Sequence, residues 1–247
     1  MDSVAASEIV KTLYLLGAAL AIGLGAVGAG IGIGMAGGAA CEGMGRQPKM
    51  TSELFRSMLI GQAAASTPPT FALVVAILLL FGNIQGATLI QGFAALGAGI
   101  SIGAAAFASG VGSSLPVAWA CEAIARQPHL RRPFMTLMLL GQAVSQTPVI
   151  FALMISFMLI FLPAKPDAGF VEFVAVLSAG ICMGFGAMGP SVGSGIAAES
   201  AIIGIRHHRN PEACVGLLTR VMLLGQAVAQ STSIYALVIS LVLVMLV

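Results

Sequence analysis

Gly225–Ser240, with the sequence GQAVAQSTSIYALVIS, lies in the last apolar run of the chain and is the third copy of one phrase. The earlier copies are GQAAASTPPTFALVVA, which begins at Gly61, and GQAVSQTPVIFALMIS, which begins at Gly141. The copies begin 80 and then 84 residues apart, and internal repetition at such a spacing indicates copies of one structural unit. We therefore divide the chain into three predicted repeats, residues 1–84, 85–165 and 166–247.

The composition is that of an integral membrane protein. Hydrophobic residues make up 58% of the 247 residues and charged residues only 8%, whereas soluble domains have about 25% charged residues. Six apolar segments each exceed the ~20 residues that a helix needs to cross a bilayer. They cover residues 8–45, 53–82, 87–125, 132–162, 169–206 and 212–246. We predict an all-α membrane protein with six transmembrane helices arranged as three tandem helical hairpins.

Basic residues mark the turn between the two helices of each hairpin. Nine of the 11 lysines and arginines lie there: Arg46, Lys49, Arg56, Arg126, Arg131, Arg132, Arg206, Arg209 and Arg220. Because positive charge accumulates in cytoplasmic loops, we expect the turns in the cytoplasm and both termini on the opposite side of the membrane. Asp2 and Glu8 stand where a signal peptide would carry positive charge, which favours a retained first membrane helix.

Each hairpin pairs a glycine-rich helix with a bulkier one. Stretches such as GLGAVGAGIGIGMAGGAA from Gly23 let helix backbones approach closely, so we expect the first helices to form an inner layer. FALVVAILLLF from Phe71 is typical of an outer, lipid-facing layer. A GxGxxG match at residues 23–28 lacks the preceding strand that a dinucleotide site needs. The cysteines show no CxxC spacing and are interpreted as packing residues rather than metal ligands or disulfides: Cys41, Cys121, Cys182 and Cys214.

The chain resembles the proteolipid, or c, subunit of rotary ATPases, particularly the F-type. Three features carry the resemblance over nearly the whole chain: the glycine-rich first helices, the RQP turns at Arg46 and Arg126, and the GQA-containing second helices, the last of which ends in IYALVIS. The resemblance implies a ring of hairpins that rotates against a stator subunit. A carboxylate of the second helix would carry a transported proton or sodium ion.

The same resemblance implies the partners. They are a homo-oligomeric or mixed c-ring, the stator a subunit, the central-stalk subunits and lipid, with no nucleic acid and no cofactor. The chain would be no enzyme by itself but a subunit of a proton- or sodium-translocating ATPase. The hairpin turns would contact the stalk through Arg46, Gln47, Pro48, Arg126, Gln127, Pro128, Arg209, Asn210 and Pro211. The alternative is that these are ordinary basic turns on the cytoplasmic side.

The chain departs from that family at the ion-carrying position. The family's carboxylate falls at Ser66, Gln146 and Gln230, none of which ionises at neutral pH. Hairpins one and two resemble the kinked, proline-containing version of the helix. Around Gln230 the chain resembles the sodium-type site. The polar residues assigned to these sites by the resemblance are Ser66, Thr67, Gln146, Thr147, Ser194, Gln230, Ser231, Thr232 and Tyr235.

Glu199 is an acidic residue within an apolar segment. It lies seven residues, about 10 Å, from Arg206, and Gln230 lies ten residues, about 15 Å, from Arg220. Because these depths differ by only about 5 Å, we hypothesise that Glu199 supplies the ionisable group of a site completed by Gln230 and its polar neighbours. The alternative is an interfacial acid that faces Arg206 or Arg220, in a ring that carries no ion at this chain.

Three functions are therefore weighed. The favoured one is a c-ring rotor subunit of a rotary ion-translocating ATPase. The second is a non-conducting structural proteolipid of a mixed or repurposed rotor ring. The third is an unrelated six-helix carrier or channel, against which the triple repeat and the RQP turn argue.

Overall fold

The computed structural model describes residues 3–82, 87–165 and 168–247, and every regular element in these ranges is a helix. The first helix of each repeat is continuous: α1 spans Ser3–Arg46, α4 spans Leu89–Arg126 and α7 spans Phe170–His207. In the first two repeats the second helix is broken in two. Its parts are α2 (Thr51–Ala65), α3 (Thr67–Phe81), α5 (Arg131–Ser145) and α6 (Thr147–Ile160). The second helix of the third repeat, α8, is continuous over Pro211–Met245.

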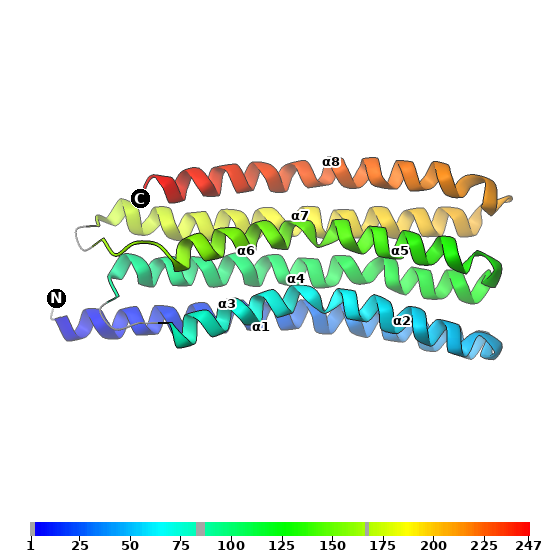
Figure 1. Cartoon of the computed structure of the whole chain (residues 1–247), viewed down its shortest axis with the longest axis horizontal. Helices are drawn as coiled ribbons and strands as arrows, with labels where there is room; N and C mark the ends of the chain where they lie inside the picture. Colours follow the sequence, from blue (N-terminus) through cyan, green and yellow to red (C-terminus); the bar gives the residue numbers. More distant parts are fainter. Residues whose placement is uncertain (1–2, 83–86, 166–167) are drawn as a thin grey trace.

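The structure confirms the predicted membrane fold. Six helical stretches of the described chain are long and apolar enough to cross a bilayer. They cover Ser7–Arg46, Pro48–Phe81, Leu89–Arg126, Pro128–Ile160, Phe170–His207 and Pro211–Met245. Short 3-10 helices, Pro48–Met50 and Pro128–Leu130, begin the second and fourth of these stretches. Both termini lie at one end of the bundle and the three hairpin turns at the other (Figure 1).

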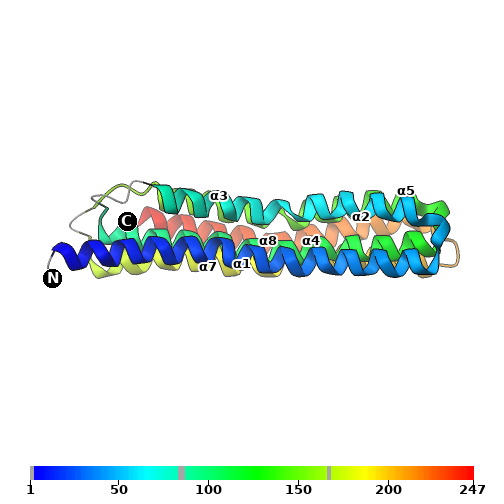
Figure 2. The same ribbon diagram turned by 90° about the horizontal axis from the view of Figure 1, so that it is seen from below.

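The helices form two rows. In the inner row, α4 packs between α1 and α7. In the outer row, α2 and α3 pack against α1 and α4, α5 and α6 pack against α4 and α7, and α8 packs against α7 (Figures 1 and 2). In the most apolar part of α4, 78% of the residues are buried, against 22% in α8. Helix α4 is therefore the centre of the core, and α8 presents a broad apolar surface.

Glycine lets the inner helices touch backbone to backbone. A Cβ atom added at Gly110 of α4 would lie 2.6 Å from the backbone nitrogen of Ala29 in α1. One added at Gly195 of α7 would lie 2.1 Å from the carbonyl oxygen of Gly112 in α4. No side chain fits at these distances, so close packing of this row requires glycine, as the glycine-rich first helices predict.

Proline breaks the outer helices of the first two repeats near their middle. Because proline has no N–H, Pro68 leaves the Ala64 carbonyl without its helical donor, and Pro148 does the same to Val144. The helices resume at Thr67 and Thr147. In α8 the matching position is Thr232, and that helix continues without a break.

Asp2 and the repeat boundary expected at 84–85 lie outside the described ranges, and the boundary expected at 165–166 lies at the edge of one of them. The division into three units at these boundaries stays a prediction.

Candidate functional site

Glutamine side chains near the helix breaks connect the outer helix of one hairpin to that of the preceding hairpin. Nε2 of Gln146 donates a hydrogen bond of 2.9 Å to the carbonyl oxygen of Ala64. Nε2 of Gln230 donates a hydrogen bond of 2.9 Å to the carbonyl oxygen of Val144. Both acceptors are carbonyls that a proline has deprived of a helical donor. We call these two hydrogen bonds the amide bridges.

Both the nitrogen and the oxygen of the Gln230 amide form hydrogen bonds. Besides Val144, its Nε2 donates to Oγ of Ser194 on α7 at 2.9 Å. Its Oε1 accepts a hydrogen bond of 3.3 Å from Oγ of Ser233, one turn further along α8. The structure thus brings together Ser194 and Gln230, which the sequence assigned to one site. It surrounds the amide with one acceptor from each of two neighbouring helices.

An amide suits these partners in a way that an ionised carboxylate does not. An ionised carboxylate has only acceptor oxygens, whereas the amide nitrogen has two donor hydrogens and needs no proton from solution. A carbonyl left without a donor at this depth costs about 1–3 kcal/mol. The amide bridges therefore supply neutral donors to the two carbonyls that proline leaves without a helical donor.

A second set of glutamines, from the GQA phrase itself, repeats this pattern one turn nearer the hairpin turns. Nε2 of the buried Gln142 donates to the carbonyl oxygen of Gly61 at 2.8 Å. Nε2 of the buried Gln226 donates to the carbonyl oxygens of Ser194 at 2.9 Å and Gly141 at 3.4 Å. The sequence predicts no contact for this glutamine, which stands there only as part of the repeated phrase. Its recurrence within apolar helices was the signal that it makes contacts between helices.

The hydroxyl residues assigned to the sites bond mainly within their own helices. Oγ of Ser66 donates to Ala63 O at 2.7 Å, and Oγ of Ser231 donates to Val228 O at 2.7 Å. Thr232 Oγ1 does the same, donating to Ala229 O at 3.0 Å, and Thr147 Oγ1 of α6 donates across the helix break to Ala143 O of α5 at 3.4 Å. Thr67 is partly buried, and Tyr235 is 67% exposed on the outer face of α8. The structure does not gather these hydroxyls around Gln230.

Glu199 lies on a different face of α7 from Ser194. Five residues separate the two, which turns their side chains about 140° apart around the helix. The Glu199 carboxylate instead interacts with the side chain of Trp119 on α4. Trp119 lines a groove formed by α1 and α4, without residues of the outer row. The two parts of the hypothesised ion site are therefore not brought together.

The arginine expected to face Glu199 pairs with another acid. Nη1 of Arg206 lies 3.1 Å from Glu122 Oε1, and its guanidinium stands 5.2 Å from the centre of the Trp119 ring. The same carboxylate lies 2.7 Å from Arg126 and 3.5 Å from Arg46. Glu122 thus ties the ends of the three inner helices together at the hairpin turns. Within the described ranges Arg220 forms no ion pair.

The expected stalk-contact residues lie together at the turn end of the bundle. Pro48 and Pro128 begin short 3-10 helices that follow Gln47 and Gln127. Gln127 reaches across to the third hairpin, where its Nε2 donates to Arg206 O at 3.0 Å. The third turn differs, because α7 ends at His207 and α8 begins at Pro211 with no 3-10 helix between them. Arg209 and Asn210 are exposed in this turn.

The cysteines of the described chain are all free, and they differ in burial. Cys121 and Cys214 are buried, Cys182 is half-buried and Cys41 is exposed. The described residues hold no cluster of three or more histidine, cysteine or acidic side chains that suits a metal ion.

Fold and site together define an integral membrane protein of three tandem helical hairpins with neutral polar groups at mid-depth. The sequence profile of the ATP synthase C-subunit family matches the chain three times, at residues 16–79, 96–159 and 177–243. These matches cover more than half of the chain, and the chain belongs to this family.

Single relatives each match about one repeat. The ATP synthase c subunit of Alkaliphilus oremlandii is 40% identical over 83 residues, which are 34% of this chain and 93% of the relative. An ATP synthase c subunit of Cereibacter sphaeroides, numbered 2 in that organism, is 42% identical over 76 residues, 31% of this chain and 92% of the relative. The ATP synthase c subunit of Thermotoga petrophila is 44% identical over 71 residues, 29% of this chain and 80% of the relative. This chain is therefore similar to three such subunits in series.

Proposed function

We propose that the chain is a c-ring rotor subunit of a rotary ATPase in which the two hairpin interfaces inside the chain carry no exchangeable ion. The observation that carries this proposal is the pair of amide bridges, Gln146 to Ala64 and Gln230 to Val144. Both glutamines stand where the family resemblance expects an ion-carrying carboxylate. Among the interpretations of the sequence, this geometry favours the non-conducting proteolipid.

The chemistry of the amide supports this choice. Ion exchange requires a group that alternates between charged and neutral forms, and an amide stays neutral. Sodium held at Gln230 would be an uncompensated charge at mid-depth. The insertion cost of a charged side chain there, about 2.5–3.5 kcal/mol, indicates the scale of the penalty. Hydrogen bonds that already satisfy the amide leave little reason for an ion to displace them.

An ion-carrying role for Glu199, with a proton or sodium, is the second candidate. It is favoured by one observation: Glu199 is half-buried within a membrane span and forms no ion pair with any described residue. Its position against Trp119, turned away from Ser194, disfavours a joint site with Gln230. We therefore rank this candidate below the proposal that the hairpin interfaces inside the chain carry no exchangeable ion.

An unpartnered glycine face on α1 supports a closed ring. Gly23 and Gly30 match Gly103 and Gly110 in the second repeat, which pack directly against the α1 backbone. Nothing lies within 4 Å of a Cβ atom added at Gly23 or Gly30. The first hairpin thus carries the same close-packing surface as the second and lacks a neighbour within the described chain. A further copy of the chain, or a carboxylate-bearing sister subunit, would fill that place.

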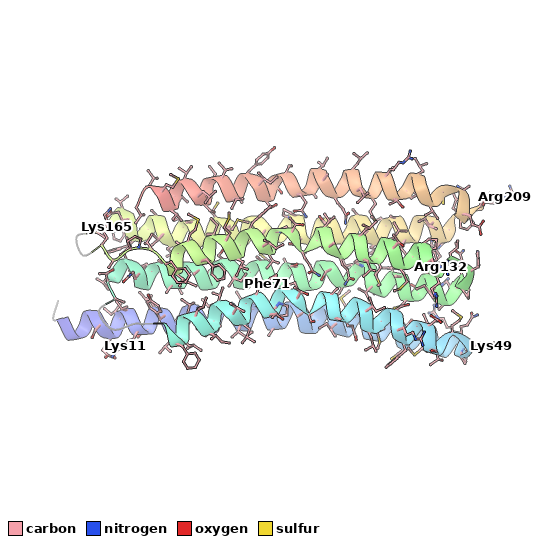
Figure 3. The ribbon with its side chains drawn as sticks, viewed as in Figure 1. Lys11, Lys49, Phe71, Arg132, Lys165 and Arg209 are labelled. Atoms are coloured by element: carbon pink, nitrogen blue, oxygen red, sulfur yellow. The ribbon has the colours of Figure 1, made fainter. Side chains whose placement is uncertain are left out.

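On this proposal the remaining partners and the orientation follow the family. The stator a subunit would face the outer row, and the central stalk would contact the hairpin turns. Basic side chains such as Lys49, Arg132 and Arg209 gather at that end, whereas Lys11 and Lys165 lie at the other (Figure 3). The excess of positive charge at the turns supports their cytoplasmic placement.

Carbodiimide labelling of carboxyl groups in the purified assembly tests the proposal. In the wild type, we expect sodium or acid to change no labelling within the membrane spans. A Gln230→Glu variant supplies a carboxylate at the family's position, and we expect its residue 230 to become labelled. If wild-type Glu199 is labelled and sodium suppresses that labelling, the proposal that these interfaces carry no ion is overturned and the second candidate is established.

A further inference from the structure

A basic groove lies between the outer helices of the first and second hairpins, near the hairpin turns. It has a volume of about 450 Å³ and is formed by α2 and α5. Three arginines line it, Arg56 from α2 and Arg131 and Arg132 from α5, together with a single acid, Glu53. This groove takes no part in the amide bridges or in the glycine packing of the inner row.

The groove has an excess of positive charge. Arg131 pairs with Glu53 across the two helices. Arg56 and Arg132 are exposed and form no ion pair with any residue that the structure describes. Two unpaired guanidinium groups therefore remain, and guanidinium groups bind phosphate oxygens through paired hydrogen bonds. An occupant with negative charge is favoured.

The depth of the groove matches that of lipid phosphates. Arg56 lies ten residues, about 15 Å, from the helix break at Ser66, and Arg132 lies 14 residues, about 21 Å, from the break at Gln146. The breaks are near the middle of their spans, and half of a typical hydrocarbon core is about 15 Å. The arginines therefore stand at the edge of the core. Ile60 and Met135 line the same groove and offer an apolar wall for an acyl chain.

The next groove along the outer row carries fewer arginines. At the spacing of the repeated phrase, Arg131 and Arg132 correspond to Val215 and Gly216 of α8, and Arg56 corresponds to Thr136 of α5. Thr136, which also lines the basic groove, corresponds to Arg220, so the equivalent positions between α5 and α8 hold one arginine in place of three. The basic groove is a feature of one interface only and not a by-product of the repeat.

The geometry points to a binding site for an anionic phospholipid between α2 and α5, with its phosphate held by Arg56 and Arg132. Its position at the edge of the core and its apolar wall favour a lipid over free phosphate or an acidic protein segment. A lipid bound there would sit between two hairpins at the outer surface of the bundle.

Native mass spectrometry of the detergent-purified assembly tests the site. Phosphatidylglycerol or phosphatidylcholine is added at equal concentration and the bound lipid is counted. We expect the wild type to retain phosphatidylglycerol in preference to phosphatidylcholine. For R56Q/R132Q we expect roughly 25-fold weaker retention of phosphatidylglycerol, from about fivefold for each arginine. R56K/R132K keeps the charge and should keep most of the preference.

Arg220 provides the matched control. It occupies the position of Arg56 in the third repeat, is exposed on α8 and does not line the basic groove. R220Q removes the same charge and should leave retention unchanged. Equal retention by wild type and R56Q/R132Q, or an equal loss in R220Q, would overturn the site. Displacement of the lipid by millimolar inorganic phosphate, or binding that appears only with the stator protein present, would overturn its assignment to lipid.

Discussion

Gln230 connects three helices with one neutral side chain. It reaches Val144 on α5, Ser194 on α7 and Ser233 on its own helix, α8. Because polar groups within the bilayer find few other partners, the contacts to α5 and α7 stabilise the association of the hairpins. The loss of a carboxylate at this position thus comes with the gain of a structural hydrogen-bond donor.

Replacement of Gln230 by leucine is predicted to destabilise the folded chain by about 1–3 kcal/mol, because the Val144 carbonyl loses its donor. The measurement is unfolding of the purified protein in mixed micelles, followed by circular dichroism. Ser231→Ala is the matched control, because that hydroxyl bonds only within its own helix, and it should change stability by less than about 0.5 kcal/mol. Equal effects of the two substitutions would contradict the amide bridge.

The positions of these glutamines were predictable from the sequence, but their partners were not. The repeated phrase aligns Ser66, Gln146 and Gln230 without any structure. The amide bridges join residues 82 and 86 positions apart, and a side chain's direction around its helix decides which neighbour it meets. The same reason explains Glu199. Its depth and its angle to Ser194 around α7 follow from the sequence, but the neighbouring side chain that it meets, Trp119 of α4, does not.

At the scale of the helix, proline and glutamine act as a pair on neighbouring outer helices. Pro68 frees the carbonyl that Gln146 binds, and Pro148 frees the one that Gln230 binds. The α8 helix has no proline at its centre, and the first hairpin has only Ser66 at the glutamine position. At a junction between α8 of one copy and the first hairpin of the next, there would therefore be neither a glutamine amide to donate nor a carbonyl that proline has freed.

A double-mutant cycle between Pro148→Ala and Gln230→Leu should show coupling. Alanine restores a helical N–H for the Val144 carbonyl, so removal of Gln230 should cost less in that background, by roughly 0.5–3 kcal/mol. The cycle between Pro68→Ala and Gln230→Leu is the control, since Pro68 frees the carbonyl bound by Gln146 instead. Those effects should add to within about 0.5 kcal/mol. Coupling of the same size in both cycles would argue against specific pairs.

The helix breaks and the extents of the helices could be predicted from the sequence. The apolar segments 53–82 and 132–162 are interrupted at Ser66 and Gln146, where the prolines indicate a kink. The extents of all six segments follow from composition, because a bilayer requires long apolar helices. The ion pairs at the turns did not follow, since Glu122 collects arginines from three different helices.

For the whole molecule, the two rows of helices form a unit with unequal edges. One edge is α1 with its open glycines, and the other is α7 and α8 with exposed apolar residues such as Phe185 and Leu224. Two different edges, one of which carries the open glycine face of α1, suit head-to-tail association of copies. Heterologous contacts of this kind close into rings when the rotation permits.

Gly30→Leu is therefore predicted to reduce assembly of copies while leaving the single chain folded. Nothing in the described chain lies within 4 Å of a Cβ atom at Gly30, so the fold of one chain has room for the substitution and we expect the clash to fall on a neighbouring copy. Gly216→Leu adds the same side chain at another open position, on the part of α8 that matches Arg132 of α5, and should leave assembly intact. Intact mass of the detergent-purified complex reports the outcome. Full assembly of Gly30→Leu would contradict the proposed junction.

An experimental density map of the membrane assembly, recorded with and without sodium, tests the central claim most directly. We predict that Nε2 of Gln230 lies within hydrogen-bonding distance of Val144 O, and Nε2 of Gln146 within that distance of Ala64 O, in both conditions. No ion density would separate either pair. Density for a bound ion at either glutamine, or a glutamine side chain that turns away from its carbonyl when sodium is added, would contradict it.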